Sequence, residues 1–300
     1  MKILLTSNKT YRNQLDGVHW YTYLPLVDMG HDVYFYDTVN PEEKNYSKVV
    51  ERFKPDLLFC CLTGDRAISP YAPWEEIARE TESGRTQTFN WYCDDTWRFD
   101  TFSKKTCHYF TVCSTPEYSS IIKYKENGYD NIIEANWHSN AKLYKNVPFE
   151  NKIIPISFAG AITDSRKIFF NVCDADIQTT SGVSHHEMLQ VHSNSKIGLN
   201  LSKNDNDPRK KTQMKQRIFE VVAGNTLLLT EYHDGLERYF EINKEIITFK
   251  SIMEFKEKSK FLLSNDKITK AIAQRGYDRF VKEHESSVRL KKTLQEIMSV

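Results

Sequence analysis

The sequence of 300 residues lacks several features that would assign it to a special class of protein. Its formal charge is only +1, which argues against a broadly cationic surface that coats nucleic acid but leaves room for a local basic patch. No apolar run approaches the roughly 20 residues that a membrane-spanning helix needs. The chain begins directly with a strand-like run, so we expect no signal peptide. These absences together predict a soluble, cytoplasmic protein that does not associate with membranes.

The six cysteines form no Cys-x-x-Cys pair, and several lie within apolar, strand-like runs. This pattern predicts reduced, buried thiols rather than a disulfide framework or a zinc site. The adjacent pair His185-His186 does not predict a metal site either, because neighbouring side chains on a helix point about 100° apart and need further ligands to share one ion. A Gly-x-Gly-x-x-Gly sequence is missing after the first predicted strand, so the standard dinucleotide fingerprint is absent. We therefore expect no bound metal and no cofactor.

Short apolar runs alternate with amphipathic segments along the whole chain, which is typical of an α/β protein with parallel sheets. The first half contains predicted strands at residues 2–6, 31–37, 55–61, 86–93, 108–113 and 131–135. A second series follows at 153–158, 196–201, 226–230 and 245–249. We expect two Rossmann-like, doubly wound domains, 1–148 and 149–300, and the last helix of the second could pack back on the first. Ligands of such sheets bind beyond the carboxyl ends of the strands, so a cleft between the halves is the expected site.

The stretch from Lys215 to Gly235 reads as a helix followed by a buried strand. Its apolar positions 218, 221 and 222 have the spacing of one helix face, and Gly224-Asn225 is a typical helix end. Glu220 is the exception, because a carboxylate next to the core needs either solvent or hydrogen-bond donors. One interpretation is an ordinary helix–strand pair. The other is a sugar-nucleotide site, with Glu220 on the ribose and basic side chains facing a diphosphate.

The segment from residue 90 to residue 100, Asn-Trp-Tyr-Cys-Asp-Asp-Thr-Trp-Arg-Phe-Asp, is the most unusual part of the first half. It leaves a predicted strand and places Asp94 and Asp95 where a sheet-edge site would lie. Adjacent carboxylates repel, which raises the pKa of one of them unless a cation such as Arg98 compensates. The structural alternative is a loop braced by an Asp–Arg pair, in which Trp91 and Trp97 serve for packing.

Both segments resemble the spore-maturation (CgeB-like) branch of the group 1 glycosyltransferases. Residues 91–100 are similar to its Trp-x-Cys-Asp-Asp-x-Trp-Arg-Phe-Asp signature, and the stretch from Arg217 on is similar to its donor-site segment. Further similar positions are Cys113-Ser-Thr-Pro-Glu, Gly128-Tyr and Asn136-Trp-His138, so the resemblance covers most of the chain. It implies a GT-B fold, with the acceptor on the amino-terminal domain and the nucleotide sugar on the carboxyl-terminal domain. It also implies transfer of a sugar from a nucleoside diphosphate, with UDP as the first choice, and no obligatory metal.

The resemblance also assigns roles to individual residues of the donor domain. Glu220 matches the glutamate that holds the ribose, and Phe158-Ala-Gly160 with Arg166 matches the loop near the diphosphate. Cations there must stabilise the charge that builds up on the departing diphosphate. The expected donor-binding set is Gly17, Gly160, Arg166, Lys215, Arg217, Glu220 and Gly235. Thr212 departs from the group 1 pattern, which has a second glutamate eight positions before Glu220, and this puts retaining stereochemistry in doubt.

The acceptor side is expected to use residues near the first and fourth strands. Gly17, after the first strand, could let backbone N–H groups approach a phosphate at a helix start. An inverting reaction needs a general base to deprotonate the acceptor hydroxyl. The candidates, in order, are Asp94, Asp95, Asp16 and His19, and the expected acceptor-binding residues are Trp91, Trp97 and Arg98.

The sequence leaves the acceptor open among a soluble glycan, a small molecule and a hydroxymethylated base in DNA. The DNA option rests on the basic run Pro208-Arg-Lys-Lys211 and on the aromatic loop 91–99, which could hold a flipped base. Two rival functions share the same fold. One is a non-catalytic sugar-nucleotide-binding module, which Thr212 keeps open, and the other is an epimerase that needs no acceptor.

Overall fold

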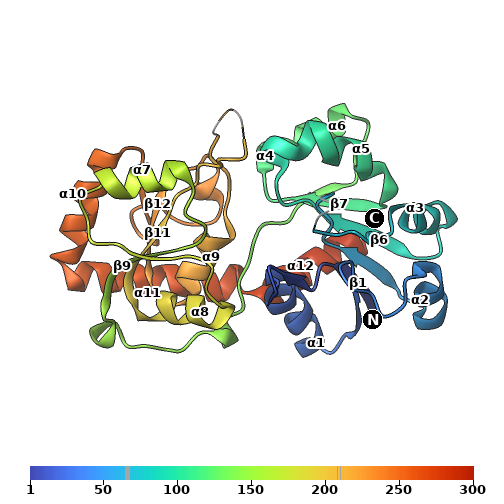
Figure 1. Cartoon of the computed structure of the whole chain (residues 1–300), viewed down its shortest axis with the longest axis horizontal. Coiled ribbons are helices and arrows are strands. Elements are labelled where there is room, and N and C mark those ends of the chain that lie inside the picture. Colours follow the sequence, from blue (N-terminus) through green and yellow to red (C-terminus); the bar gives the residue numbers. More distant parts are fainter. Residues whose placement is uncertain (65–67, 208, 210) are drawn as a thin grey trace. The chain divides into compact units, whose positions relative to one another are not determined.

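The computed structural model describes residues 1–64, 68–207, 209 and 211–300, and these form two compact units (Figure 1). The first unit consists of Met1–Asn136 together with Ser286–Val300, and the second consists of Trp137–Glu285. The sequence predicted a boundary at residue 148, whereas the chain passes from one unit to the other after Asn136. The last helix, α12 (Ser286–Ile297), packs its buried face in the first unit against β1, with Leu290, Leu294 and Ile297 in the same core as Ile3 and Leu5.

The first unit is built on a six-stranded sheet in the order β4-β1-β5-β6-β7-β8, and every neighbouring pair is parallel. The central strands are buried along their whole length, as expected of a parallel sheet with helices on both faces. The strands are β1 (Lys2–Ser7), β4 (Asp32–Asp37), β5 (Leu57–Cys60), β6 (Gln87–Trp91), β7 (Val112–Thr115) and β8 (Ile132–Glu134).

The helices of the first unit include two short π-helices, η1 (His19–Tyr23) and η2 (Phe99–Ser103), both in segments that the sequence singled out. Such turns are frequent at functional sites. A small hairpin, β2 (Thr10–Tyr11) and β3 (Gln14–Leu15), occupies the predicted polar loop, and its turn residues Arg12 and Asn13 both have positive φ. The α-helices are α1 (Leu24–Asp28), α2 (Tyr46–Phe53), α3 (Trp74–Ser83), α4 (Asp95–Arg98), α5 (Lys104–Thr106) and α6 (Ile121–Glu126).

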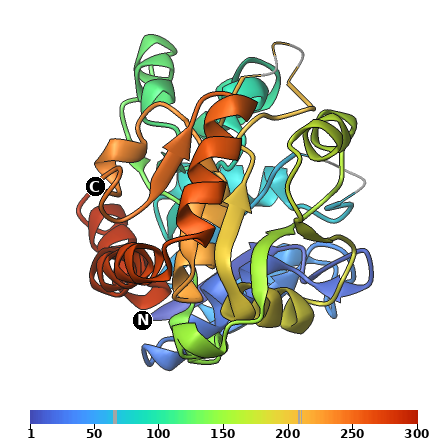
Figure 2. The ribbon, with the colours of Figure 1, turned by 90° about the vertical axis from the view of Figure 1, so that its left-hand side faces the viewer.

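The second unit has a five-stranded parallel sheet in the order β10-β9-β11-β12-β13. Figure 2 shows β9 (light green) and β11 (yellow) side by side and running in the same direction. The strands are β9 (Ile154–Ala159), β10 (Gln178–Thr180), β11 (Ser195–Asn200), β12 (Leu227–Glu231) and β13 (Ile247–Phe249). The helices are α7 (Asp164–Val172), α8 (His185–Asn194), α9 (Gln216–Ala223), α10 (Ile252–Leu263) and α11 (Asp266–Glu283). The sequence did not predict β10, which is a short, polar edge strand.

The central helix–strand pair has the predicted form. Helix α9 ends at Gly224, and Asn225 takes the left-handed conformation (φ 49°) that ends the helix before β12. Gly198 lets α9 lie close on β11, because a Cβ at this position would come within 2.5 Å of Cγ1 of Val221. The helix that carries Arg217 and Glu220 is therefore held directly against the sheet.

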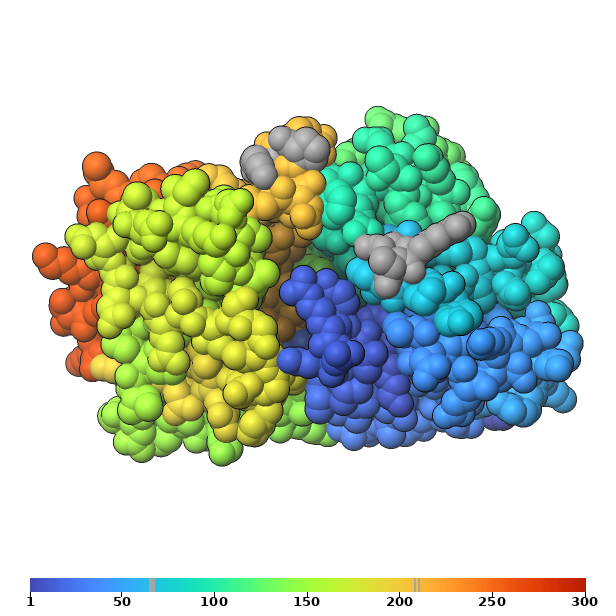
Figure 3. All heavy atoms as spheres, viewed as in Figure 1, coloured from blue at the N-terminus to red at the C-terminus, as the bar shows by residue number. Residues whose placement is uncertain are grey.

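Helix α7 covers one face of the second sheet and also contributes to the surface of this unit (Figure 3). Its inner side packs through Phe169, whose ring lies 5.1 Å from that of Phe255 in α10. Its outer side leaves Ile168 64% exposed. Helices α7 and α10 are therefore neighbours beside the carboxyl ends of the strands.

In each sheet the strand order reverses beside the first strand of the unit, which is β1 in the first unit and β9 in the second. The chain leaves β9 through α7 toward the edge strand β10, then returns to β11 on the other side of β9 and continues outward. The carboxyl ends of β9 and β11 thus flank the topological switch point, where open α/β sheets bind their ligands. In the first unit, β1 and β5 flank the corresponding point.

Candidate donor site

Arg217, in the first turn of α9, bridges the switch point of the second sheet. Its Nε donates a hydrogen bond to the carbonyl oxygen of Ala159, at the end of β9. Its Nη1 donates to Oδ1 of Asn200 (3.0 Å), at the end of β11. The central guanidinium carbon lies 4.3 Å from the ring centroid of Phe158. One cationic side chain therefore connects both strand ends that flank the crevice.

Arg166, in α7, brings a second guanidinium to the same ring, 5.3 Å from the centroid of Phe158. Burial lowers the pKa of both arginines, and the charge of Arg166 lowers the pKa of Arg217 further, whereas Glu220 opposes this shift. Two partly desolvated cations thus lie within electrostatic reach of each other. An anion placed between them would be stabilised by both.

The loop between β9 and α7 shapes this cationic site. Gly160 has a φ of 149°, and a Cβ at this position would overlap Nη2 of Arg217, so the close approach of the guanidinium requires glycine. Thr163 occupies the N-cap of α7 but does not cap the helix with its side chain. Its Oγ1 is enclosed and has no hydrogen-bond partner among the described residues. Sequence reasoning identified Gly160 but missed Thr163.

The other predicted donor residues lie on adjoining elements of the same sheet edge. Glu220 is on α9, one turn after Arg217, and is only 8% exposed. Lys215 is the N-cap residue of α9 and is half-buried. Gly235, with a φ of 93°, begins the short helix η7 (Leu236–Arg238) in the loop after β12. The structure thus gathers Gly160, Arg166, Arg217 and Glu220 around the crevice.

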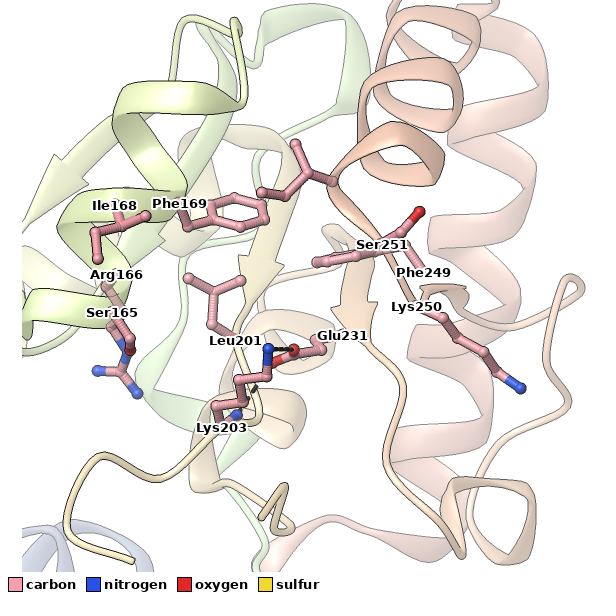
Figure 4. A pocket seen from close by; sticks show the side chains of 11 residues that line it. Ser165, Arg166, Ile168, Phe169, Leu201, Lys203, Glu231, Phe249, Lys250 and Ser251 are labelled. Carbon is pink, nitrogen blue, oxygen red and sulfur yellow. Dashed lines mark hydrogen bonds and ion pairs between the residues drawn. The ribbon is translucent and has the colours of Figure 1, made fainter. Parts of the chain in front are cut away.

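A pocket of about 270 Å³ continues from Arg166 along the ends of β11, β12 and β13 (Figure 4). Its apolar lining consists of Ile168, Phe169, Leu201, Phe249 and Ile252, and its polar lining of Ser165, Arg166, Lys203, Glu231, Lys250 and Ser251. Figure 4 shows Lys203 and Glu231 side by side, and Oε2 of Glu231 accepts hydrogen bonds from the backbone N–H groups of Ser202 (2.9 Å) and Lys203 (3.0 Å). An apolar pocket with a few polar groups at its rim is the usual form of a small-molecule site.

The sequence analysis missed two residues of this edge, Asn200 and Glu231, although their positions in the sequence indicate them. Asn200 is a fully buried amide in the apolar run of β11, and its Nδ2 bonds Oγ1 of Thr230 at 2.9 Å. Glu231 ends β12 and holds the loop after β11. A polar residue at the last position of a buried strand is the signal, since that position reaches the carboxyl edge of the sheet.

In the first unit, the structure corrects the role expected for Asp95. This residue is completely buried, and its two carboxylate oxygens accept hydrogen bonds from the hydroxyls of Ser103 (2.5 Å) and Tyr124 (2.7 Å). Burial raises its pKa to about 6, against the effect of these bonds. A carboxylate enclosed in this way is not accessible to an acceptor hydroxyl. We therefore assign Asp95 a structural role in the segment from α4 to η2.

The Asp–Arg pair of the structural alternative is present. Nε of Arg98 lies 3.7 Å from Oδ2 of Asp94, and Nη1 of Arg98 donates to the carbonyl oxygen of Thr63 (2.7 Å). The same guanidinium lies 4.5 Å from the ring centroid of Trp97. Nε1 of Trp91 donates to the carbonyl oxygen of Ala135 (2.9 Å). These contacts indicate that Trp91 and Arg98 stabilise the loop. Asp94 and Trp97 are half-buried at the sheet edge.

The remaining base candidates follow β1. Oδ1 of Asp16 accepts a hydrogen bond from the backbone N–H of Val18 (3.0 Å), and burial raises the pKa of Asp16. His19 begins η1, and its ring stacks on that of Tyr23 with 5.3 Å between centroids. Burial lowers the pKa of His19, and Lys9 lowers it further. The imidazole is therefore neutral at pH 7.

Gly17, which we expected to approach a phosphate, does not need to be glycine for steric reasons. A Cβ there would lie 3.6 Å from the ring of Tyr21, which is an ordinary contact distance. Pro208 and Lys210 of the predicted basic run lie outside the described residues. The backbone N–H of Arg209 and its Nε both donate to Oδ1 of Asp207, so this arginine is paired within the loop.

Thr212, which stands in place of the expected acid, bonds through Oγ1 to Nδ1 of His233 (3.1 Å). Across residues 1–64, 68–207, 209 and 211–300, no group of three or more His, Cys, Asp and Glu side chains is arranged to hold a metal ion. Within the same ranges, no helix combines the length and the apolar character needed to cross a bilayer.

Comparisons with known proteins add to this geometry. Residues 149–295 match the family model described as glycosyl transferase-like. HepE from Anabaena, solved in complex with UDP-glucose, is 10% identical over 100% of both chains, with a TM-score of 0.64. T4 phage BGT, solved in complex with its UDP-glucose substrate, is 12% identical over 100% of both chains, with a TM-score of 0.67. Sucrose-phosphate synthase from Thermosynechococcus elongatus is 9% identical over 99% of both chains, with a TM-score of 0.67.

The fold is GT-B, and residues 149–295 match the glycosyl transferase-like family. The chain is thus an enzyme that transfers a sugar from a nucleotide sugar, as the sequence predicted. No curated protein matches this sequence. Assignment of the glycosyltransferase to the CgeB-like branch remains a prediction, as do its cytoplasmic location and the absence of a cofactor.

Proposed function

We propose that this glycosyltransferase uses a UDP-sugar whose diphosphate binds at the switch point of the second sheet. The observation that carries the proposal is the bridge that Arg217 makes between the ends of β9 and β11, with Arg166 over the same Phe158 ring. Charge accumulates on the diphosphate as the sugar leaves, and preorganised guanidinium groups stabilise it. UDP is the first choice because HepE and T4 phage BGT were both solved with UDP-glucose.

The nucleoside of the donor extends from the diphosphate into the neighbouring groups. Glu220, which lies one turn after Arg217 on α9, accepts hydrogen bonds from the ribose hydroxyls. The base enters the pocket that begins at Arg166, where Phe169, Leu201 and Phe249 offer an apolar surface to a planar ring. Arg166 is part of both the cationic site and the lining of the pocket, which supports the binding of one ligand across the two.

The acceptor hydroxyl is deprotonated in this proposal by His19, the last of the four predicted candidates. Asp94 is engaged in an ion pair with Arg98, and Asp95 is enclosed in the core. His19 is neutral at pH 7 and can accept a proton. The reaction is then inverting, in agreement with Thr212 at the position of the expected acid. The signature in residues 91–100 supports membership of the CgeB-like branch.

The donor site is tested by comparing the binding of two anions to wild type and two variants. We expect UDP and inorganic pyrophosphate both to raise the Tm of the wild-type protein. Glu220→Gln should lose most of the shift with UDP and keep the shift with pyrophosphate, because only UDP carries ribose. Glu257→Gln, an exposed glutamate on α10, is the matched control. Equal UDP shifts in wild type and Glu220→Gln would contradict the ribose assignment, and no shift with any nucleotide would contradict the donor site.

A further inference from the structure

Lys152 lies just before β9 and is unusual for a lysine because it is only 4% exposed. Its Nζ donates hydrogen bonds to three uncharged acceptors. These are the carbonyl oxygens of Ser193 (2.5 Å) and Gly224 (3.1 Å) and Oγ1 of Thr226 (3.1 Å). A buried ammonium held by uncharged acceptors alone is costly in comparison with one that is paired with a carboxylate.

The three acceptors define a specific place in the fold. Ser193 is in the last turn of α8, and Gly224 is the C-cap of α9. The carboxyl end of a helix carries a partial negative charge, so one ammonium interacts favourably with both helices. The helix ends are in close contact, because a Cβ at Gly224 would come within 3.0 Å of the carbonyl carbon of His192. Lys152 therefore joins the carboxyl ends of α8 and α9.

We propose that Lys152 is a positioning residue for the donor site, which it serves by fixing the carboxyl end of the helix that carries Arg217 and Glu220. The proposal rests on the proposed function in so far as these two side chains bind the donor. Helix α9 has only eight residues, and Gly198 holds its middle directly on β11. A displacement at Gly224 is thus transmitted along about 10 Å of helix to the guanidinium at the switch point.

The described groups around Lys152 offer it no negative charge. His192, on α8, is buried, and neither ring nitrogen has a hydrogen-bond partner among the described residues. Burial lowers the pKa of His192 to about 3, and the charges of Arg217, His185 and Lys152 act in the same direction, so this imidazole is neutral at neutral and alkaline pH. Burial also lowers the pKa of Lys152 to about 8. Above that pH a neutral amine has two protons to donate instead of three, and the link between the helix ends weakens.

The first test uses the wild-type protein without any nucleotide. Hydrogen exchange of the amides of residues 218–223 is measured from pH 7 to pH 9.5 and corrected for the intrinsic pH dependence of exchange. We expect their protection to fall about tenfold around pH 8, while the protection of β12 is maintained. Lys152→Met should show the weaker protection already at pH 7 and no further step. Unchanged protection of residues 218–223 in this variant would overturn the proposal.

The second test measures UDP affinity by titration calorimetry at a temperature well below the Tm of every protein. We expect a loss of about tenfold for Lys152→Met and partial recovery for Lys152→Arg. Leu262→Ala, which destabilises the same unit from α10, and Lys270→Met, which removes an exposed lysine paired with Glu150, should bind UDP as wild type does. If Lys152 contributed to stability alone, Lys152→Met would lower the Tm as Leu262→Ala does and leave the UDP affinity intact. That result would also overturn the proposal. If wild type binds no UDP, the proposed function fails, and the exchange experiment still decides the role of Lys152.

Discussion

The two sheets of this protein have the same strand order around their switch points, but the side chains gathered at their carboxyl edges differ in charge. The second sheet holds Arg166 and Arg217 over Phe158. The corresponding edge of the first unit holds the Asp94–Arg98 pair, Asp16 and the neutral His19. One edge is suited to an anionic diphosphate and the other to removal of a proton from a hydroxyl. Topology decides where a ligand can bind, and the side chains decide which one.

The backbone of the cationic edge is closely specified at two glycines. Gly160 must be glycine for Arg217 to approach the end of β9, and Gly198 must be glycine for α9 to approach β11. In the first unit, Gly17 has no such requirement. The donor side therefore depends on close packing of main chain, and changes there should affect binding before they affect chemistry.

The largest expected effect lies on the first unit. His19→Gln should lower the rate of sugar transfer by about 10²- to 10⁴-fold, because general base catalysis contributes this much, and should leave UDP affinity unchanged. Asp94→Asn should cost less than about tenfold in the same assay. Transfer rates with saturating UDP-sugar, measured beside UDP affinity, check this. A fully active His19→Gln protein would make Asp94 the first candidate for the general base again.

A smaller effect is expected from crowding the cationic edge. Gly160→Ala should weaken UDP binding by about tenfold or more and lower the stability by about 1–3 kcal/mol, since the new methyl group displaces Arg217 and the residue keeps a positive φ. Gly182→Ala is the matched control, because Gly182 also has a positive φ (69°) but has open space around its Cβ position. Calorimetric titration with UDP separates the two variants. Equal UDP affinities of the two variants would argue against a role for the Gly160 approach.

The smallest expected effects are on the pH dependence of stability. The contribution of a buried group in the first unit should have the opposite sign to that of one in the second unit. Burial lowers the folded-state pKa of His192 to about 3, so the unfolded chain takes up a proton below about pH 6.5 that the folded chain does not, and stability falls as the pH falls. Asp95 has a folded-state pKa of about 6, so the folded chain takes up the proton first, and stability rises as the pH falls from 7 toward 5. Each contribution amounts to about 1–2 kcal/mol at pH 5.

Urea unfolding at pH 5, 6 and 7 measures both contributions. As the pH falls, the free energy of unfolding of wild type should decrease relative to that of His192→Leu. Relative to that of Asp95→Asn, it should increase. A pH-independent difference for either variant would show that the buried group does not titrate as its surroundings indicate.

The alternation of apolar runs and helical segments predicted ten of the strands, since a buried parallel strand leaves a clear apolar signal. It missed β10 and the hairpin β2–β3, which are short and polar and are fixed by tertiary context. The helical pattern singled out Glu220 as a carboxylate next to the core and left a sugar-nucleotide site as one of two interpretations. Resemblance to a family then favoured that interpretation and added Arg166. The enclosure of Asp95 could not be foreseen, because it depends on Ser103 and Tyr124, which are distant in sequence or carry no signal of their own.

Calorimetric titration of UDP shows whether Arg217 holds the donor diphosphate. The variants are Arg217→Gln and, as a matched control, Arg275→Gln, since Nε of Arg275 also donates to a backbone carbonyl in the same unit, that of Lys244. We expect Arg217→Gln to weaken UDP binding by about 100-fold, because two or more charge-assisted hydrogen bonds are lost, and Arg275→Gln to bind UDP as wild type does. Wild-type affinity for UDP in Arg217→Gln would show that Arg217 does not hold the diphosphate.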